Sequence, residues 1–250
     1  MSSSYVSLLQ ITDSHLSKNI NFTLQGMNTY DSLHKVLSDI KVCSFDFISI
    51  TGDISEDGSR ASYQHFLKLI QDFGINLNLL VPGNHDNYKK IQSVFDNSVF
   101  QQLQFAGNWL FVAINSQVAG EDYGYISSKQ LEILKNSIRD NPDKFIAIFM
   151  HHHVLPLGSA WIDNYSLHNS DELHEILHDA RNVKAVISGH VHQEFNALYN
   201  HIQFFCSPST CMQFKPNVSQ FEIDKFIPGY RKFCFYPDGQ ITSEVKYIES

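Results

Sequence analysis

Short apolar runs alternate with longer amphipathic stretches along most of the chain. Each run has the length of a strand and is rich in β-branched and aromatic residues, which is typical of strands buried on both faces. The runs cover residues 5–11, 45–50, 75–81, 109–114, 145–150 and 183–187. The stretches between them predict helices over residues 29–40, 62–73, 127–138 and 170–180. In the last of these, Leu173, Ile176 and Leu177 share one helical face after Ser170, which is suited to cap the helix.

Strands that alternate with helices predict an α/β protein. The pattern changes towards the C-terminus, where residues 231–248 alternate apolar and polar positions around Asp238-Gly239 and predict a β-hairpin. Residues 201–210 predict one more strand. The C-terminal part is therefore expected to be β-rich and to extend or cover the layers formed before it. Since no linker, low-complexity tract or repeat interrupts the chain, residues 1–250 are expected to form one domain.

Polar residues directly follow five of the predicted strands. They are Asp13-x-His15, Gly52-Asp53, Gly83-Asn84-His85-Asp86, His151 and Gly189-His190-x-His192. Because open α/β sheets bind ligands outside the carboxyl ends of their strands, these side chains are expected to form one composite site. Residues i and i+2 of an extended segment point to the same side, which lets Asp13 and His15 face one ion. The glycines before Asp53, Asn84 and His190 allow sharp turns and the close approach of a ligand.

Carboxylate, amide and imidazole groups without a thiolate suit a hard or borderline divalent cation. Asp53 is the expected bridge between two such ions, because one shared carboxylate lowers their mutual repulsion. Two neighbouring ions can generate a hydroxide from water and clamp a phosphoryl oxygen. The site would be locally cationic and would attract phosphate anions. The residues therefore predict a dinuclear metal centre that acts on phosphate esters.

Composition narrows the class of partner. The formal net charge is −8, and Lys and Arg form no cluster, which argues against a nucleic-acid polymer as ligand. No run approaches the roughly 18 apolar residues of a membrane helix, and residues 1–12 lack the features of a signal peptide. The four cysteines form no Cys-x-x-Cys pair, so reduced thiols in a cytoplasmic protein are expected. The oligomeric state stays open, with a homodimer as one option.

The ordered motifs D-x-H, G-D, G-N-H-D, H and G-H-x-H over residues 13–192 resemble the signature of the calcineurin-like metallophosphoesterases. Residues 150–173, 189–194 and 207–216 are similar to the bacterial class III 3′,5′-cyclic-AMP phosphodiesterases, so the resemblance covers nearly the whole chain. It implies a four-layer α-β-β-α sandwich. It also implies hydrolysis of 3′,5′-cyclic AMP to 5′-AMP, by attack of a hydroxide held at two metal ions.

The resemblance also implies a role for each motif residue. One ion would be held by Asp13, His15, Asp53 and His192, and the other by Asp53, Asn84, His151 and His190. Substrate would contact His15, Asp53, Asn84, His85 and His192. His85 matches the residue that contacts phosphate and can protonate the leaving oxygen, and Asp86 matches the residue that orients the His85 imidazole. The implied cofactors are two divalent or mixed-valence ions, Fe and/or Mn first, with Zn or Co as alternatives.

Two other functions fit the same residues. The protein could act mainly on another small diester, a 2′,3′-cyclic nucleotide or a glycerophosphodiester, because the sequence contains no base-recognition motif. It could also be a non-catalytic metal-binding scaffold, although every ligand position is intact. Alternation along the strand sends His152 away from the ions, and Asp57 is expected to serve a turn. Trp161 either packs in the core or stacks on an adenine.

Overall fold

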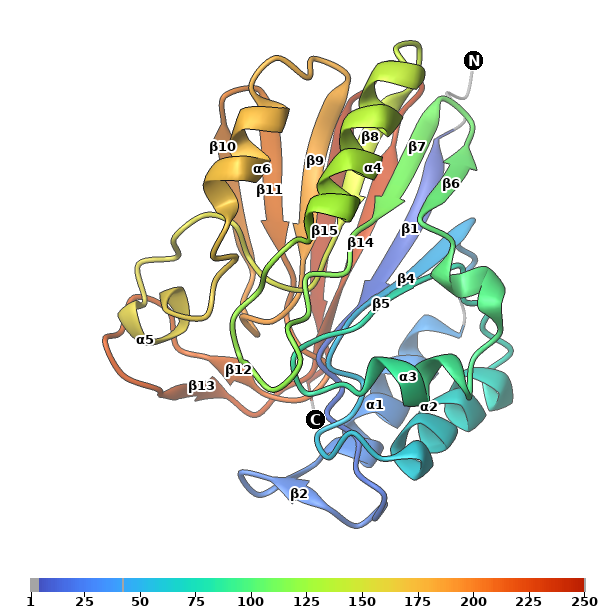
Figure 1. Cartoon of the computed structure of the whole chain (residues 1–250). Coiled ribbons are helices and arrows are strands. Elements are labelled where there is room, and N and C mark those ends of the chain that lie inside the picture. Colours follow the sequence, from blue (N-terminus) through green and yellow to red (C-terminus); the bar gives the residue numbers. More distant parts are fainter. Residues whose placement is uncertain (1–4, 42, 250) are drawn as a thin grey trace.

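The computed structural model describes residues 5–41 and 43–249. Of residues 1–12, which the sequence analysis considered as a signal peptide, the first four lie outside the described residues. Two central sheets stack face to face (Figure 1). In the first sheet the strand order is β15-β14-β1-β4-β5, with β1, β4 and β5 parallel to one another. Its strands are β1 (Val6–Ile11), β4 (Phe47–Thr51), β5 (Leu79–Val81), β14 (Gly229–Phe235) and β15 (Ile241–Tyr247).

The second sheet has the strand order β10-β11-β9-β8-β7-β6. Its four central strands are parallel, and an antiparallel strand closes each edge. Its strands are β6 (Leu103–Ala106), β7 (Trp109–Ala113), β8 (Phe145–Phe149), β9 (Val183–Ser188), β10 (Phe195–Tyr199) and β11 (Ile202–Cys206). Two small hairpins lie outside the sheets, formed by β2 (Thr23–Leu24) with β3 (Met27–Asn28) and by β12 (Gln213–Phe214) with β13 (Ile223–Lys225).

Helices cover the outer faces of the two sheets (Figure 1). Those on the first sheet are α1 (Thr29–Ile40), α2 (Arg60–Asp72) and the short α3 (Tyr88–Gln92), with the 3₁₀ helix η1 (Asn97–Phe100) next to β5. Those on the second are α4 (Ser128–Asp140) and α6 (Ser170–Leu177), while α5 (Ala160–Asp163) lies in the loop after β8. The order of layers is therefore helix, sheet, sheet, helix, as the family resemblance predicts.

Alternation along each strand explains why the apolar runs are continuous. Leu9 packs against the helices of the first sheet, whereas its neighbour Leu8 packs between the two sheets. On the second sheet, Leu110 faces the helices and Phe111 faces the other sheet. Strands covered on both faces bury apolar side chains on each face, and so the sequence does not alternate regularly between apolar and polar residues there.

The C-terminal part extends the first sheet, as predicted. β14 pairs antiparallel with β1, and β15 continues the hairpin around Gly239. The last helix differs from expectation in one detail, because Ser170 is its first residue and Asn169 occupies the capping position. The Asn169 side chain instead bonds the backbone of Ile126. Within the described chain, no helix is both long and apolar enough to cross a membrane.

Candidate metal centre

The predicted site residues meet at the edge where the parallel strands of both sheets have their carboxyl ends. The first sheet contributes the segments after β1, β4 and β5, and the second contributes those after β8 and β9. The backbone N–H of His190 donates to both carboxylate oxygens of Asp13, at 3.0 and 3.1 Å, across 177 positions of sequence. Asp13, Asp53, His151, His190 and His192 are all buried. The composite site predicted from the strand ends is therefore present in space.

The backbone at the site is not extended. The prediction that Asp13 and His15 face one ion because they alternate along an extended segment is therefore wrong in its reason. Asp13, His15, Asp53, His190 and His192 all have positive φ, between 45° and 70°. Left-handed backbone is uncommon for non-glycine residues, costs about 1–3 kcal/mol each, and tends to cluster at functional sites. Asp13 and His15 reach one site through successive left-handed turns and not through strand alternation. This turning brings their side chains back over the ends of the sheets.

The glycines serve the packing of the site more directly than the entry of a ligand. A Cβ on Gly83 would collide with the Asp53 carboxylate, and one on Gly189 would collide with the Thr12 side chain. Gly52 combines a φ of +97° with contact against the His151 ring. The chain segments lie so close together that only glycine fits at these three positions.

Three histidines share one arrangement of hydrogen bonds. The Nδ1 atom of His15 lies 2.7 Å from Glu56 Oε2, that of His151 lies 2.7 Å from the Thr51 carbonyl, and that of His192 lies 3.0 Å from the Met212 carbonyl. In each case an acceptor holds the Nδ1 proton, which leaves the Nε2 lone pair directed into the cluster. Metal-ligating histidines in proteins commonly have this outer hydrogen bond, because it fixes the tautomer and the ring.

The inward nitrogens and oxygens form two neighbouring groups. In the first, Asp13, His15 and His192 offer ligand atoms within 4.8 Å of one another, and the Nε2 atoms of the two histidines are 3.1 Å apart. In the second, His151 Nε2 lies 3.0 Å from Asn84 Oδ1 and 3.2 Å from His190 Nδ1. These are the same two sets that the resemblance implies for two ions.

Asp53 lies between the two groups. One oxygen of its carboxylate, Oδ2, is 3.7 Å from His15 Nε2 and 3.4 Å from His151 Nε2. Its other oxygen accepts the backbone N–H of His85 at 2.9 Å. This placement agrees with the bridging role expected from the sequence.

The charges of the cluster suit divalent cations. Burial alone would raise the pKa of Asp53, yet the neighbouring His151 and His85 hold that pKa well below its usual range. Burial lowers the pKa of His190, and the neighbouring imidazoles of His152 and His151 lower it further, which keeps a neutral nitrogen available. No Lys or Arg forms an ion pair with Asp13 or Asp53 within residues 5–41 and 43–249. Buried carboxylates with only imidazoles around them fit a metal site.

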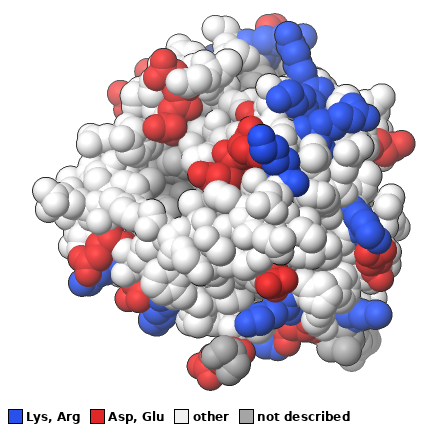
Figure 2. Space-filling model, turned by 90° about the horizontal axis from the view of Figure 1, so that it is seen from below, with Lys and Arg blue, Asp and Glu red and all other residues white. Residues whose placement is uncertain are grey.

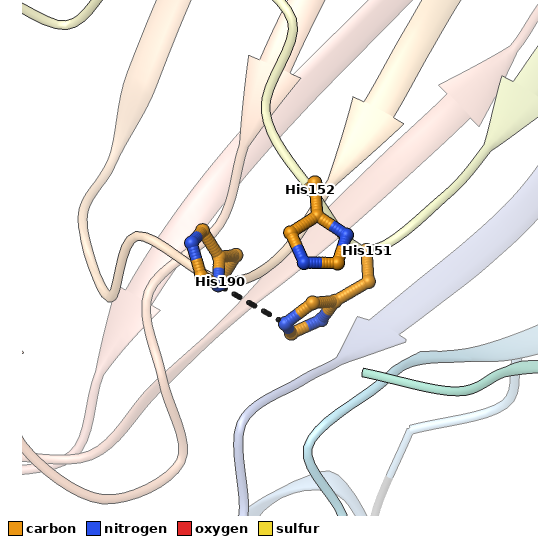
Figure 3. Close-up of side chains that lie close together, drawn as sticks. All are labelled: His151, His152 and His190. Carbon is orange, nitrogen blue, oxygen red and sulfur yellow. Dashed lines mark hydrogen bonds between the residues drawn. The ribbon is translucent and has the colours of Figure 1, made fainter. Parts of the chain in front are cut away.

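His152 lies closer to the site than strand alternation predicted. Figure 3 shows its ring beside those of His151 and His190, and nitrogens of the three lie within 4.8 Å of one another. Its Nδ1 is 2.8 Å from the Ser116 hydroxyl, and its ring packs on Gly124. Burial holds the pKa of His152 well below its usual range, so this imidazole is neutral. Its ring packs against both neighbouring rings, with centroids 4.9 Å from that of His151 and 4.8 Å from that of His190.

Asp86 has different partners from those implied by the resemblance. Its carboxylate accepts the backbone N–H groups of Gly83, Ile54 and Ser55, at 3.0 to 3.3 Å, and so fixes the loop that carries Asn84. Burial, followed by the nearby charge of Asp53, raises the pKa of Asp86 to about 6. It therefore shapes the loop, and the His85 ring faces another carboxylate.

That carboxylate belongs to Glu56, which the sequence analysis did not single out. Glu56 Oε2 is 3.3 Å from His85 Nδ1 and also accepts from His15 at 2.7 Å. Burial alone would lower the pKa of His15, but the hydrogen bond to Glu56 and the nearby charge of Asp53 together outweigh burial and raise that pKa to about 9. Glu56 stands three residues after Asp53, and only its position in "GDISEDG" could have indicated it.

Glu56→Gln is expected to weaken metal retention and activity about 10–100-fold, the usual cost of losing a partner of a ligating histidine. Metal content after dialysis against a weak chelator, together with turnover, measures the loss. Asp57→Asn is the matched control, because Asp57 accepts from the backbone of Lys18 and Ser59 and is not paired with a histidine in the described chain. Equal behaviour of the two variants would refute the role given to Glu56.

A cavity of about 200 Å³ opens over the cluster. Its floor is formed by the imidazoles and by Asp53 and Asn84. One wall is apolar and contains Trp161, Tyr165 and Phe214. Phe214 stacks flat on His192, with ring centroids 4.0 Å apart, and Trp161 meets Phe214 edge-on at 5.2 Å. The site thus combines a polar, metal-suited floor with an aromatic wall.

Residues 6–194 match the calcineurin-like phosphoesterase family, and the chain belongs to this family. It is 38% identical to the 3′,5′-cyclic adenosine monophosphate phosphodiesterase CpdA of Haemophilus influenzae, over 98% of this chain and 90% of that protein. The protein of the same name from Escherichia coli strain K12 is also 38% identical, over 96% and 89%. A dimetal phosphatase from Danio rerio shares the fold, with a TM-score of 0.69 at 15% identity, over 96% of this chain and 98% of that one.

Proposed function

We propose that this protein is a dinuclear metal-dependent phosphodiesterase that hydrolyses 3′,5′-cyclic AMP to 5′-AMP. The observation that carries the substrate is the 38% identity to cyclic-AMP phosphodiesterases over nearly the full length of both chains. The cluster of Asp and His residues supports the chemistry but not the choice of ester. The aromatic wall above the cluster supports a substrate with a nucleoside end.

One ion would be held by Asp13, His15, Asp53 and His192, and the other by Asp53, Asn84, His151 and His190. Fe and/or Mn are the proposed metals, with Zn or Co as alternatives, since mixed nitrogen and oxygen ligation suits all four. When bound, such a pair supplies Lewis acidity at the phosphoryl oxygens and lowers the pKa of a water. The outer hydrogen bonds of His15, His151 and His192 hold the donors in place for it.

The remaining residues position the ester and move a proton. His85 is partly exposed at the cavity, and Glu56 holds its Nδ1, so the opposite edge of the ring can face the substrate. In cyclic AMP the bond from phosphorus to the 3′ oxygen breaks, and that oxygen departs as a poor leaving group unless it is protonated. His85 is placed to donate this proton. Asp86 contributes by fixing the loop that carries His85.

A substrate panel tests the proposal. Protein stripped of metal by a chelator is expected to be inactive, and Mn²⁺ or Fe²⁺ is expected to restore hydrolysis of cyclic AMP to 5′-AMP. The value of kcat/KM should be higher for cyclic AMP than for 2′,3′-cyclic AMP or glycerophosphodiesters. Product chromatography shows which bond breaks, and metal analysis of the same samples relates activity to bound ions.

Three results would contradict different parts of the proposal. A higher kcat/KM for a 2′,3′-cyclic nucleotide or a glycerophosphodiester would contradict cyclic AMP as the substrate but not the metal-dependent hydrolysis of diesters. Activity that survives complete removal of metal would contradict the dinuclear mechanism. Absence of turnover on every ester, in protein that carries two ions, would favour a binding scaffold.

A further inference from the structure

We propose that Asp122 is a specificity-determining residue that excludes dianionic phosphate monoesters from the site and favours release of the product. The inference deepens the proposed function, because it concerns the same cavity and the charge of the ester that the cavity accepts. It rests on the charges around the cavity, on the anchoring of the loop that carries Asp122, and on the difference in charge between a diester and a monoester.

The cavity contains unusually little fixed positive charge for a phosphate site. Among the described residues that line it there is no Lys or Arg, and the carboxylates are Asp53 and Asp122. Asp53 lies on the floor against His15 and His151, so these rings compensate its charge. Asp122 is exposed and lines the cavity, and no ion pair within the described chain compensates its charge. Figure 2 views this face, where red acidic side chains lie along the edge of the hollow.

The loop around Asp122 is fixed to the rest of the site. Two residues further on, Gly124 donates its N–H to the Ser166 carbonyl at 3.1 Å, and its own carbonyl accepts from the backbone of His168 at 2.8 Å. The Tyr123 ring stacks on His168, with centroids 3.9 Å apart and planes 2° from parallel. Gly124 also packs directly on the His152 ring. The segment that directly follows Asp122 is therefore fixed relative to the histidine cluster.

A fixed negative charge at the rim distinguishes two classes of phosphate ester. A diester carries one negative charge, and the charges of the metal centre attract it. A monoester carries about −1.5 to −2 charges at pH 7. The additional charge is repelled by Asp122, and no Lys or Arg lines the cavity to offset that repulsion. Hydrolysis of a cyclic diester creates such a monoester, so the same repulsion lowers the affinity for the product.

Asp122→Asn tests the inference, since it removes the charge and keeps the shape of an exposed side chain. The kcat/KM for p-nitrophenyl phosphate is expected to rise about tenfold, while that for bis(p-nitrophenyl) phosphate, which carries half the charge, rises only about threefold. Calorimetry on the manganese-loaded protein should show 5′-AMP binding about tenfold more tightly and dimethyl phosphate, a monoanion, only about threefold more tightly. Glu121→Gln is the control, because Glu121 is the adjacent exposed acid and does not line the cavity.

Ionic strength provides a readout that a structural role of Asp122 would not affect. Salt screens an exposed charge, so discrimination against the monoester should weaken more between about 0.1 M and 1 M salt in the natural protein than in Asp122→Asn. Equal monoester-to-diester ratios and equal 5′-AMP affinities in both proteins would overturn the inference. If the protein does not hydrolyse cyclic AMP but hydrolyses other esters, the proposed substrate is wrong and the Asp122 test remains valid. If it hydrolyses no ester, the comparison of 5′-AMP affinities between the two proteins still tests the role of Asp122.

Discussion

Asp53→Ala is expected to lose both metal ions and more activity than the about 10²–10⁴-fold that a general acid contributes. The reason is geometric, because one Asp53 oxygen lies between His15 Nε2 and His151 Nε2, at 3.7 and 3.4 Å. Removing it takes a ligand from each ion and also leaves two buried imidazoles without their carboxylate. Metal analysis after gel filtration measures the first effect, and turnover of cyclic AMP measures the second.

Asp53→Asn and Asn84→Ala serve as comparisons for this loss. The asparagine keeps the volume of Asp53 but not its charge, so it separates metal binding from packing. Asn84 Oδ1 lies 3.0 Å from His151 Nε2, in the second group, so Asn84→Ala should weaken one ion more than the other. Since a ligand that binds the folded state stabilises it, Mn²⁺ should raise the Tm of the natural protein and leave that of Asp53→Ala unchanged. Full metal content in Asp53→Ala would exclude the bridge.

His85→Ala is expected to retain its metal and to lose about 10²–10⁴-fold in turnover of cyclic AMP. The His85 ring pairs with Glu56 at the edge of the cavity, and the hydrogen bond from His85 to Asp53 comes from its backbone N–H, which the substitution keeps. The 3′ alkoxide of cyclic AMP needs a proton, whereas a nitrophenolate departs as a stable anion. The loss should therefore be much smaller for a nitrophenyl diester. Equal losses on the two substrates would point to phosphate positioning in place of proton transfer.

The arrangement of layers could be predicted because local pattern and global packing agree. The apolar run at 109–114 alternates between Leu110, which faces the helices, and Phe111, which faces the other sheet. Elements outside this pattern escaped prediction. β10 is a partly exposed edge strand with Leu198 71% exposed, and α3 has only five residues, so neither has the periodic apolar face that marks an element in a sequence.

The gathering of the site residues could also be predicted, since polar residues after parallel strands meet at one edge of a sheet. The direction of individual side chains could not. Asp86 is adjacent to His85 in sequence but turns to the backbone of Gly83 and Ser55, while Glu56 comes from another loop to face that ring. Adjacency in a motif does not determine which side chains touch. The left-handed backbone at Asp13 and Asp53 likewise depends on contacts made after the sheets have assembled.

The hydrogen bond between the Asp13 carboxylate and the His190 backbone has a consequence for the synthesis of the protein. It joins residues 177 positions apart, and β1, which leads to Asp13, pairs on one side with β14, near the end of the chain. A ribosome-bound chain that has exposed only its first half holds Asp13 and Asp53 but lacks His151, His190 and His192. Contacts of such long sequence separation form late, because their loop closure is costly. The metal centre can therefore be assembled only after the segment that carries His190 and His192 has emerged from the ribosome.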